Sequence, residues 1–530
     1  MVAKSKELAD FEHFDVYEEV NQAEYDSDNV ISTEWVLVEK EKTDGTKVVK
    51  ARLCMRGDQE RNKHNIPADS PTANKITIRI LLALAVSKGW TVTASDVRRA
   101  FLQTQDIERQ VLVKPPQEAG VQKGKLWLLK RACYGLIDAS RAYFLRHARQ
   151  LNQFGFTPLQ FDPATFVWRE KDEIKAVYAA HVDDCLVTGE LEAVKTAQEK
   201  MAEKFDYGEI QQLPIRFLGI NISQDQEGDI TLDQEHYVKD LEVPDMDEIK
   251  SLNKLDILPE KFQSIFRSLA SKINMLALSS RPDFAFAAKY LTSRYGKAVK
   301  SDLSRVVKLI NKAREEPSIV AVPNIGQIEE WTIVAISDAS TKKYNNIFAV
   351  GGYVVMLVNK ITGAAVTLLW SSKKIDRVVN SSLAAETLAL QKMTGKIFLI
   401  RKLLEGLLGE KAKRIPCIAL IDSQNLWSCI HNLKACNDDR LQADIISIRQ
   451  AIHDDHSIQE VRFVPTWEML ADSLTKQTTL LDNNLLNTVR AGHYELPGGH
   501  QVRDSTRTSV KTWAQLIRAE QEDEQSQAQT

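Results

Sequence analysis

The stretch YAAHVDDCLVTG, from Tyr178 to Gly189, places two adjacent acids between two apolar runs. Because strand side chains alternate between two faces, Asp183 and Asp184 are expected at the tip of a β-hairpin. A plain hairpin tip is the simpler interpretation, since Asp is common in tight turns. The alternative is a metal site, because paired carboxylates supply the oxygen ligands that hard divalent cations prefer. The rest of the chain decides between the two.

The chain has 530 residues, of which 43% are hydrophobic and 27% charged, so it is long enough for several domains. A formal net charge of −3 means that any basic surface for nucleic acid must be local. No apolar run is long enough to span a bilayer, no Walker A loop occurs, and the charged start shows no signal-peptide pattern. The six cysteines form no CxxC pair, which predicts free thiols in a reducing compartment.

The first half of the chain has the pattern of alternating strands and helices. After about thirty acidic, weakly patterned residues, the run 35–57 predicts a β-hairpin that turns at Asp44-Gly45. Residues 73–90 predict an amphipathic helix, and residues 91–97 predict a strand with Asp96 at its end. Two more helices are expected on either side of the hairpin at Tyr178–Gly189, over 141–154 and 190–205.

Residues 217–323 are mixed in pattern and mostly helical. They include a strongly basic run with few acids, which contains Arg294, Lys297, Lys300, Arg305, Lys308, Lys312 and Arg314. Such a run is either a solvated helix face or, in a nucleic-acid enzyme, a surface that contacts phosphates.

A new unit begins near Trp331 with three successive predicted strands. A long helix follows, with Ser381 or Ser382 as its N-cap, and then strands and helices alternate in the order β-β-β-α-β-α-β-α. This order defines a small mixed α/β domain. The charged, Gln-rich tail that ends the chain is expected to be disordered.

Four acids stand at strand ends or helix starts of this unit: Asp338, Glu386, Asp422 and Asp472. Taken singly, each is explained as a cap or a surface group. Strand ends and helix starts on one side of a sheet can converge, however, and a cluster of carboxylates binds two divalent cations. The same reasoning applies to Asp96 and Asp183, if their two strands are neighbours in the first unit.

Eleven stretches in one collinear order, from about Trp35 to Lys476, resemble one family. They include SDVRRAFLQ, LKRACYGLIDASRAYF, YAAHVDDCLVTG, FRSLASKINMLALSSRPDFAFA, SSLAAETLAL, LIDSQNLW and VPTWEMLADSLTK. The chain resembles the reverse transcriptase and ribonuclease H portion of a copia-type (Pseudoviridae-like) retrotransposon Pol polyprotein. The resemblance implies a multidomain α/β and α+β fold, in which a right-hand polymerase with fingers, palm and thumb precedes a ribonuclease H-like mixed-sheet domain.

The implied organisation has five parts. A disordered acidic leader is expected over 1–30, fingers and palm over 31–222, and a thumb or connection over 223–328. A ribonuclease H-like domain is expected over 329–480, and a partly disordered extension over 481–530. No protease, zinc or integrase signature is found. The chain is therefore a processed fragment, a truncated element copy or a host-encoded relic.

The resemblance also assigns site residues. Asp96, Asp183 and Asp184 match the polymerase carboxylates, with Asp96 and Asp183 as direct metal ligands and Asp184 supporting the site or the primer end. Asp338, Glu386, Asp422 and Asp472 match the family's catalytic quartet for ribonuclease H, and all four are implied metal ligands. Phe101 matches the steric gate that favours dNTPs, although an ordinary core Phe is an equal alternative. Lys50 or Arg52 is expected at the triphosphate, and which of the two remains open.

Two stretches depart from the family pattern. His181 stands where a Tyr is common before Val-Asp-Asp, and it is expected at the primer end. Asp138 and Ser140 stand where the family has Gln and Pro. The Gln would help to position the nucleotide, and an acid there is unfavourable unless it points away or meets a cation.

The expected function is RNA-directed DNA polymerase with ribonuclease H activity, using two Mg²⁺ ions per site, with Mn²⁺ as an alternative. The expected partners are an RNA template, a DNA primer, an RNA/DNA hybrid and dNTPs, with capsid and integrase as further element proteins and no membrane. A cytoplasmic virus-like particle is implied as the location, with the nucleus as an alternative. The alternative function is a relic that binds nucleic acid without polymerase activity, or that retains only ribonuclease H.

Overall fold

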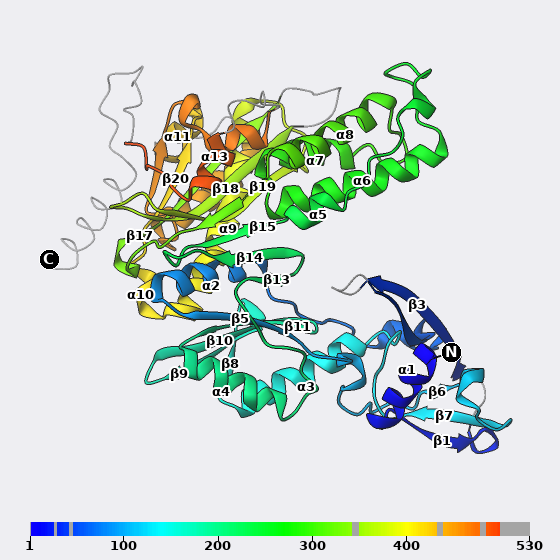
Figure 1. Cartoon of the computed structure of the whole chain (residues 1–530). Coiled ribbons are helices and arrows are strands. Elements are labelled where there is room, and N and C mark those ends of the chain that lie inside the picture. Colours follow the sequence, from blue (N-terminus) through cyan, green and yellow to red (C-terminus); the bar gives the residue numbers. More distant parts are fainter. Residues whose placement is uncertain are drawn as a thin grey trace, which may run out of the picture. The chain divides into compact units, whose positions relative to one another are not determined.

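The computed structural model describes residues 2–25, 29–41, 46–317, 319–341, 349–431, 438–476 and 484–498 (Figure 1). The chain divides into two compact units. Unit 1 contains Met1–Asn74 and Thr91–Gln212, and unit 2 contains Lys75–Trp90 and Leu213–Thr530. The predicted multidomain mixture of helix and sheet is confirmed. The division at 212–213 lies ten residues before the predicted one, and the segment Lys75–Trp90 belongs to unit 2.

Unit 1 is built on a six-stranded antiparallel sheet in the order β12-β5-β11-β10-β9-β8. Two amphipathic helices, α3 and α4, bury their apolar faces on it, with Tyr143, Leu151 and Met201 in the shared core. The bounds are β5 (Thr91–Asp96), α3 (Ala139–Gln153), β8 (Phe156–Leu159), β9 (Asp162–Glu170), β10 (Glu173–His181), β11 (Asp184–Gly189), α4 (Leu191–Ala202) and β12 (Gln211–Gln212). The predicted strands and helices of this region are therefore confirmed.

The leader was predicted to be disordered, and this prediction is wrong. It forms α1 and β1, and Phe11 is fully buried in a core with Trp127. A four-stranded sheet, β1-β7-β6-β2, and a separate β3–β4 ribbon complete the unit. Asp44-Gly45 lies outside the described residues, but β3 and β4 pair from Thr33↔Met55 to Glu41↔Lys47. The bounds are α1 (Val2–His13), β1 (Tyr17–Asn21), β2 (Val30–Ile31), β3 (Thr33–Glu41), β4 (Lys47–Met55), β6 (Leu112–Val113) and β7 (Lys125–Leu129).

Unit 2 contains a helical part and a mixed sheet. In the helical part, α6, α7 and α8 share one apolar core, and β13–β16 form an antiparallel sheet. Helix α2 joins this unit through the buried Arg79, which donates to the carbonyls of Ser279 and Leu368. The bounds are α2 (Lys75–Lys88), β13 (Ile215–Phe217), β14 (Ile220–Gln224), β15 (Ile230–Asp233), α5 (Glu235–Lys239), α6 (Glu260–Ser279), α7 (Ala285–Thr292), α8 (Lys300–Glu315) and β16 (Ile319–Val322).

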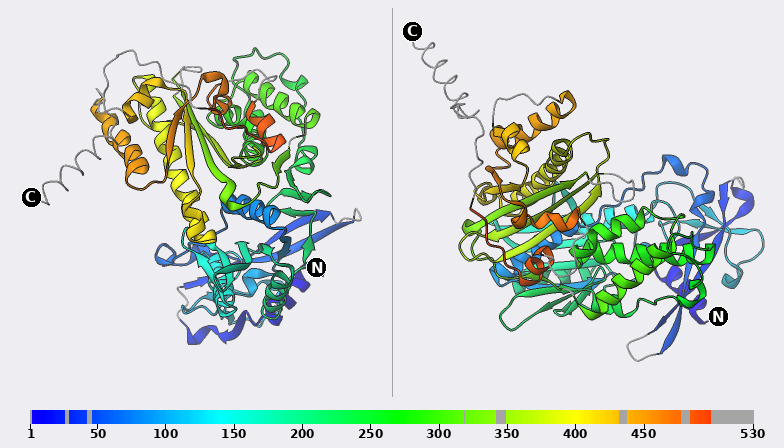
Figure 2. Two further views of the ribbon diagram at one scale, coloured as in Figure 1. Left: turned by 90° about the vertical axis from the view of Figure 1, so that its left-hand side faces the viewer. Right: turned by 90° about the horizontal axis from the view of Figure 1, so that it is seen from above.

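The mixed sheet has the order β19-β18-β17-β20-β21, with three antiparallel strands followed by two parallel ones. The long helix α9 packs against β17 and β18 (Figure 2), and the Ser381 hydroxyl caps it by accepting from the Ala384 N–H. The bounds are β17 (Trp331–Ser340), β18 (Val350–Asn359), β19 (Ala365–Lys374), α9 (Ser382–Leu408), α10 (Glu410–Lys413), β20 (Cys417–Ile421), α11 (Gln424–His431), α12 (Asp439–His453), β21 (Glu460–Phe463) and α13 (Asn484–Ala491).

Three details qualify the predictions for the whole chain. The last helix expected around Asp472 is a 3₁₀ helix, η11 (Leu470–Leu474). The charged tail from residue 499 lies outside the described residues. Among the described helices, none is long and apolar enough to cross a membrane.

Candidate active sites

The β10–β11 hairpin of unit 1 has a two-residue turn, Val182-Asp183. His181 and Asp184 are the last paired residues before this turn. Val182 has φ 61°, which is rare for a β-branched residue and is typically maintained only by surrounding structure at functional sites. The Asp183 carbonyl accepts a hydrogen bond of 2.9 Å from the Val97 N–H, which ties the turn to the end of β5.

Three acids of unit 1 meet at this turn. Strand β11 pairs with β5, and Asp184 lies directly opposite Asp96. Burial raises the pKa of the Asp184 carboxyl, and the charges of Asp183 and Asp96 raise it further, while His181 lowers it. The carboxylates of Asp96 and Asp183 therefore lie close enough to Asp184 to affect its titration.

Gly208 makes room for the Asp96 side chain. Its N–H donates to the Asp96 carbonyl at 2.7 Å. A Cβ atom at position 208 would lie 1.9 Å from Asp96 Oδ1, far inside van der Waals contact. The sequence argument missed Gly208, because nothing in the local pattern pairs it with a strand more than one hundred residues earlier.

In unit 2, Asp338, Glu386 and Asp422 form a compact cluster. Asp338 lies near the end of β17, Glu386 in the first turns of α9, and Asp422 directly after β20. Each offers a carboxylate oxygen within 4.8 Å of those of the other two, and no other such group of three occurs in the described part of the chain. Two strand ends and one helix start therefore bring together three of the four acids that were expected to converge.

The carboxylates of this cluster hold protons more tightly than usual. Burial, together with the charges of Asp338 and Asp422, raises the pKa of Glu386 to about 9. Burial likewise raises the pKa of Asp338 to about 7, and it raises the pKa of Asp422. Glu386 Oε2 is buried and has no hydrogen-bond partner among the described residues. A cation that binds here would relieve both the repulsion and the unpaired oxygen.

Asp472 is near the cluster but is not one of its three members. Its carboxylate accepts a hydrogen bond of 2.7 Å from Lys476 Nζ, which also lies 3.8 Å from Asp338 Oδ2. The neighbouring Thr475 hydroxyl donates to Asp338, and Thr466 donates to Asp422 at 2.9 Å. Sequence reasoning missed Lys476 and both threonines, although the stretch ADSLTK places Thr475 and Lys476 one turn after Asp472.

The sequence comparisons cover the region that contains the first of these acidic groups. Residues 14–250 match the family model described as reverse transcriptase (RNA-dependent DNA polymerase). Residues 14–250 are a reverse transcriptase domain. This domain contains all three acids of unit 1, and it ends before the cluster of unit 2 begins.

The relatives are Pol polyproteins of copia-type transposons. The chain is 26% identical over 472 residues to the retrovirus-related Pol polyprotein from transposon RE2 of Arabidopsis thaliana, which covers 84% of this chain and 31% of that protein. It is 28% identical over 222 residues to the polyprotein from transposon TNT 1-94 of Nicotiana tabacum, which covers 39% of this chain and 16% of that one. The chain therefore spans less than a third of the length of these relatives.

Among solved structures, the chain is similar to the foamy viral protease-reverse transcriptase dRH in complex with ds DNA. The TM-score is 0.46 at 16% identity, and the match covers 81% of this chain and 64% of that one. The predicted resemblance to copia-type Pol polyproteins is confirmed by the family model and the transposon relatives.

Asp138 of the reverse transcriptase domain meets a cation. Its two carboxylate oxygens accept hydrogen bonds of 2.6 and 2.9 Å from Arg109, which also pairs with the buried Glu60. The Asp138 side chain is only 14% exposed. This is the condition under which an acid at this position was expected to be tolerated. The nearby Ser140 contributes its carbonyl, which accepts from the Ser70 hydroxyl.

Phe101 lies in the 3₁₀ turn η5 (Ala100–Leu102), just after β5, and is partly buried. Its ring makes edge contacts with Tyr134 and Tyr143, at centroid distances of 5.4 and 6.4 Å. Phe101 therefore has the packing of a core residue, and the role of steric gate stays a prediction.

Two basic residues lie on the β4 strand of this domain. The Arg52 guanidinium lies over the Tyr134 ring at 5.7 Å, and Lys50, two residues earlier, presents its exposed side chain on the same strand face. The geometry brings Arg52 into the aromatic group that contains Phe101.

His181 has one ring nitrogen in the turn interior. Its Nδ1 is buried and has no hydrogen-bond partner within the described ranges. The ring lies close enough to Asp184 to lower the pKa of that carboxyl. His181 is thus placed at the acidic turn, as predicted, and its contact with a primer end stays a prediction.

Proposed function

We propose that the chain is an RNA-directed DNA polymerase with ribonuclease H activity from a copia-type retrotransposon. The observation that supports this most directly is the meeting of Asp96, Asp183 and Asp184 at one strand end inside a reverse transcriptase domain. The separate cluster of Asp338, Glu386 and Asp422 supports the second activity. Two sets of acids on two compact units are the arrangement that two separate hydrolytic and transfer sites require.

The residues of both sites suit divalent cations. Asp96 and Asp183 would hold two Mg²⁺ ions in the polymerase site, and Mn²⁺ has the same preference for oxygen ligands. The trio of unit 2, with Asp472 nearby, would hold two more, because burial raises the pKa of its carboxylates and Glu386 Oε2 has no hydrogen-bond partner among the described residues. Bound in pairs, such ions activate the attacking oxygen and stabilise the leaving oxygen of a phosphodiester.

The remaining side chains would position the substrates. Arg52 offers a cation for the triphosphate, held in place by Tyr134. Phe101 is packed between two tyrosine rings, and as a steric gate its rigid ring would exclude a ribose 2′-hydroxyl. Arg109 binds both carboxylate oxygens of Asp138, so the acid at this departure from the family pattern is paired with a cation. The expected substrates are dNTPs, an RNA template with a DNA primer, and the resulting hybrid.

The test is primer extension on a poly(rA)/oligo(dT) duplex with Mg²⁺, with DNA product and RNA cleavage measured in one reaction. Asp183→Asn should abolish extension and spare cleavage, and Glu386→Gln should do the reverse. Each variant is the matched control for the other, because each removes one carboxylate charge at constant volume. If either substitution abolished both activities in a folded protein, the assignment of two sites would be wrong.

A relic that only binds nucleic acid is the competing function. It predicts salt-sensitive binding of the duplex with neither extension nor cleavage. Cleavage without extension would instead indicate that only the ribonuclease H site works. The cytoplasmic particle implied by the family remains part of the proposal, and the location of element RNA and protein in cells would test it.

A further inference from the structure

A cavity of about 660 Å³ lies beside the acidic cluster of unit 2. Its lining includes residues of helix α8 and also Ser473 and Lys476. Lys476 is the residue that contacts Asp472 and Asp338. Six of the lining residues are basic: Lys254, Lys300, Arg305, Lys308, Lys312 and Lys476. Asp283 is the single acid in the lining, so the cavity has a strong positive charge next to the cluster.

The basic residues of α8 that line the cavity share one face of the helix. Arg305, Lys308 and Lys312 follow each other at intervals of three and four residues. From the first to the last, the row is about 10 Å long, because an α-helix rises 1.5 Å per residue. That length matches roughly three steps along one strand of a duplex at 3.4 Å per step.

Several members of the basic run have a structural role. Arg294 pairs with Asp302 of α8, Lys300 donates to two main-chain carbonyls, and Arg314 donates to the carbonyl of Leu241. The interpretation as a solvated or structural helix face is therefore correct for these three.

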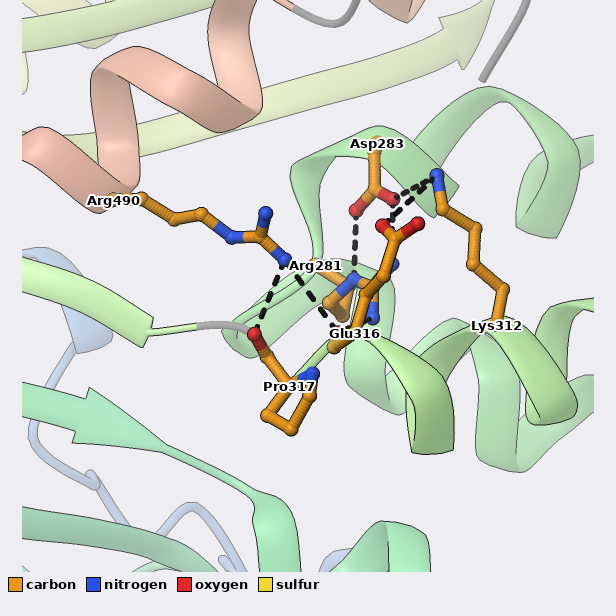
Figure 3. Close-up of polar contacts among 6 residues, drawn as sticks. All are labelled: Arg281, Asp283, Lys312, Glu316, Pro317 and Arg490. Carbon is orange, nitrogen blue, oxygen red and sulfur yellow. Dashed lines mark hydrogen bonds and ion pairs between the residues drawn. The ribbon is translucent and has the colours of Figure 1, made fainter. Parts of the chain in front are cut away.

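Lys312 belongs to a buried network that forms the floor of the cavity. Figure 3 shows Asp283 between Arg281 and Lys312, with contacts of 2.7 and 3.3 Å to their nitrogens. The Arg281 and Asp283 side chains are each 2% exposed. The network neutralises the only acid of the lining, so Asp283 does not cancel the charge of the exposed lysines.

Lys254 and Lys308 differ from these residues. Both are exposed, and neither has an ion-pair partner among the residues that the structure describes. Arg305 lies between them in the lining, with its guanidinium over the Tyr290 ring at 5.1 Å. The Lys254 and Lys308 side chains are available to an anion that enters the cavity, without loss of an ion pair within the described residues.

We propose that this cavity binds the phosphate backbone of one strand of the RNA/DNA hybrid and holds it beside the Asp338 cluster. The inference rests on the proposed ribonuclease H function. The physical need is clear: an acidic cluster repels a polyanion, and a basic row alongside it compensates for that repulsion. Lys254 and Lys308 are positioning residues for cleavage, and they take no part in the chemistry.

A second basic cavity provides a matched control. It has a volume of about 530 Å³ and lies between α9 and the ends of β18 and β19, with Lys373, Lys392 and Lys396 in its lining. Lys373 and Lys392 are also exposed and have no ion-pair partner in the described ranges. The pair Lys373→Ala/Lys392→Ala therefore removes the same charge from the same unit, at a cavity whose lining does not include Lys476.

The experiment compares the two double variants of the full chain with a defined RNA/DNA hybrid. Lys254→Ala/Lys308→Ala should weaken hybrid binding and raise KM for cleavage roughly ten- to thirtyfold at 0.15 M salt, because two phosphate contacts are lost. The slope of log K against log salt should become shallower by about 1 to 2. We expect kcat and the melting temperature to stay unchanged, and Lys254→Arg/Lys308→Arg to behave like the wild type.

Equal losses in the two alanine variants, or an unchanged salt slope in the first, would overturn the proposal. Hybrid binding is measured with Glu386→Gln as well, which should bind and not cleave. If the wild type binds the hybrid but never cleaves it, the ribonuclease H function fails while the binding arm still tests the cavity. A loss confined to Lys254→Ala/Lys308→Ala would then still support the phosphate contact.

Discussion

Gly208→Ala is the smallest change that should disable the polymerase site. The added Cβ would lie 1.9 Å from Asp96 Oδ1 and 2.8 Å from Cγ, whereas ordinary contact begins at 3.4 Å. The Asp96 carboxylate must therefore move by about 1.5 Å, the difference between 3.4 and 1.9 Å. The backbone at Gly208 is not left-handed, so alanine fits its conformation, and the clash with Asp96 is the whole effect.

A displacement of this size is large for a metal ligand. A misplacement of 1 Å at a reacting centre can cost about 10²-fold in rate, so we expect extension to fall at least about a hundredfold. The loss should appear in kcat more than in KM, because Asp96 acts on the reacting groups and not on the distant parts of the duplex. Cleavage of the hybrid should stay unchanged, since Gly208 belongs to unit 1 and the Asp338 cluster to unit 2.

The assay is primer extension and RNA cleavage in one tube, with the melting temperature as a check of folding. Gly395→Ala is the matched control, because its Cβ in α9 would meet nothing within 4 Å. It should keep both activities, and removal of a glycine from a helix interior should stabilise the protein by about 0.5–1 kcal/mol. Wild-type extension by a folded Gly208→Ala protein would refute the argument that Asp96 must occupy this position.

Three further outcomes follow from the described contacts. In metal-free protein, the raised pKa of Glu386, about 9 against 4.5, favours folding at low pH, so the melting temperature should fall as pH rises from 5 to 8. Added Mg²⁺ or Glu386→Gln should flatten that slope, and a rise with pH would contradict it. Asp138→Gln, which restores the family residue, should cost about 1–3 kcal/mol in denaturant unfolding and should not improve extension, because Arg109 loses two charged hydrogen bonds. Arg281→Ala should cost about 3–5 kcal/mol, because it leaves Asp283 buried beside Lys312 alone, and Arg281→Ala/Asp283→Asn should recover part of this loss in the same measurement.

Elements with a strong local signal were predicted correctly from the sequence. The strand β5, the β10–β11 hairpin and α2 are mostly apolar runs that end at a turn or a glycine. Helix α2 was predicted to be amphipathic, which is wrong, because all of its residues from Ile76 to Val86 are buried. Helix α9 also has an N-cap serine that makes the expected hydrogen bond. The acidic clusters could be predicted for a related reason, because the ends of neighbouring strands and the start of a packed helix must lie close together.

The N-terminal leader shows where local signals fail. Its helix α1 has weak amphipathicity, and its order depends on Phe11 entering a core with Trp127, more than a hundred residues away. The same limit applies to α2, whose pattern predicts a helix but not the unit it joins. That choice depends on Arg79, which binds carbonyls of Ser279 and Leu368. Contacts of this kind have no short-range signature.

Asp472 shows how a motif can predict the neighbourhood of a site without its exact membership. The sequence places it at the start of an element beside the cluster, and its charge does raise the pKa of Asp338. Yet Lys476, four residues later, donates a hydrogen bond of 2.7 Å from its Nζ to the Asp472 carboxylate. Lys476 lies closer to Asp472, at 2.7 Å, than to Asp338, at 3.8 Å, and a carboxylate held closely by a lysine is a weaker cation ligand. We therefore propose Asp338, Glu386 and Asp422 as the primary ligands of a bound cation.

The departures from the family pattern are also better judged by their surroundings than by the residues alone. Asp138 looks unfavourable for a triphosphate site when only its own stretch is read. In the fold, Arg109 from a loop 29 residues earlier binds both of its oxygens and also pairs with Glu60, so the three residues form one hydrogen-bonded group of one cation and two acids. A single acid would repel the substrate, whereas an acid already satisfied by a guanidinium contributes little field of its own. The change at position 138 and the presence of Arg109 are therefore one feature of this chain, and substitution of either residue alone tests the other.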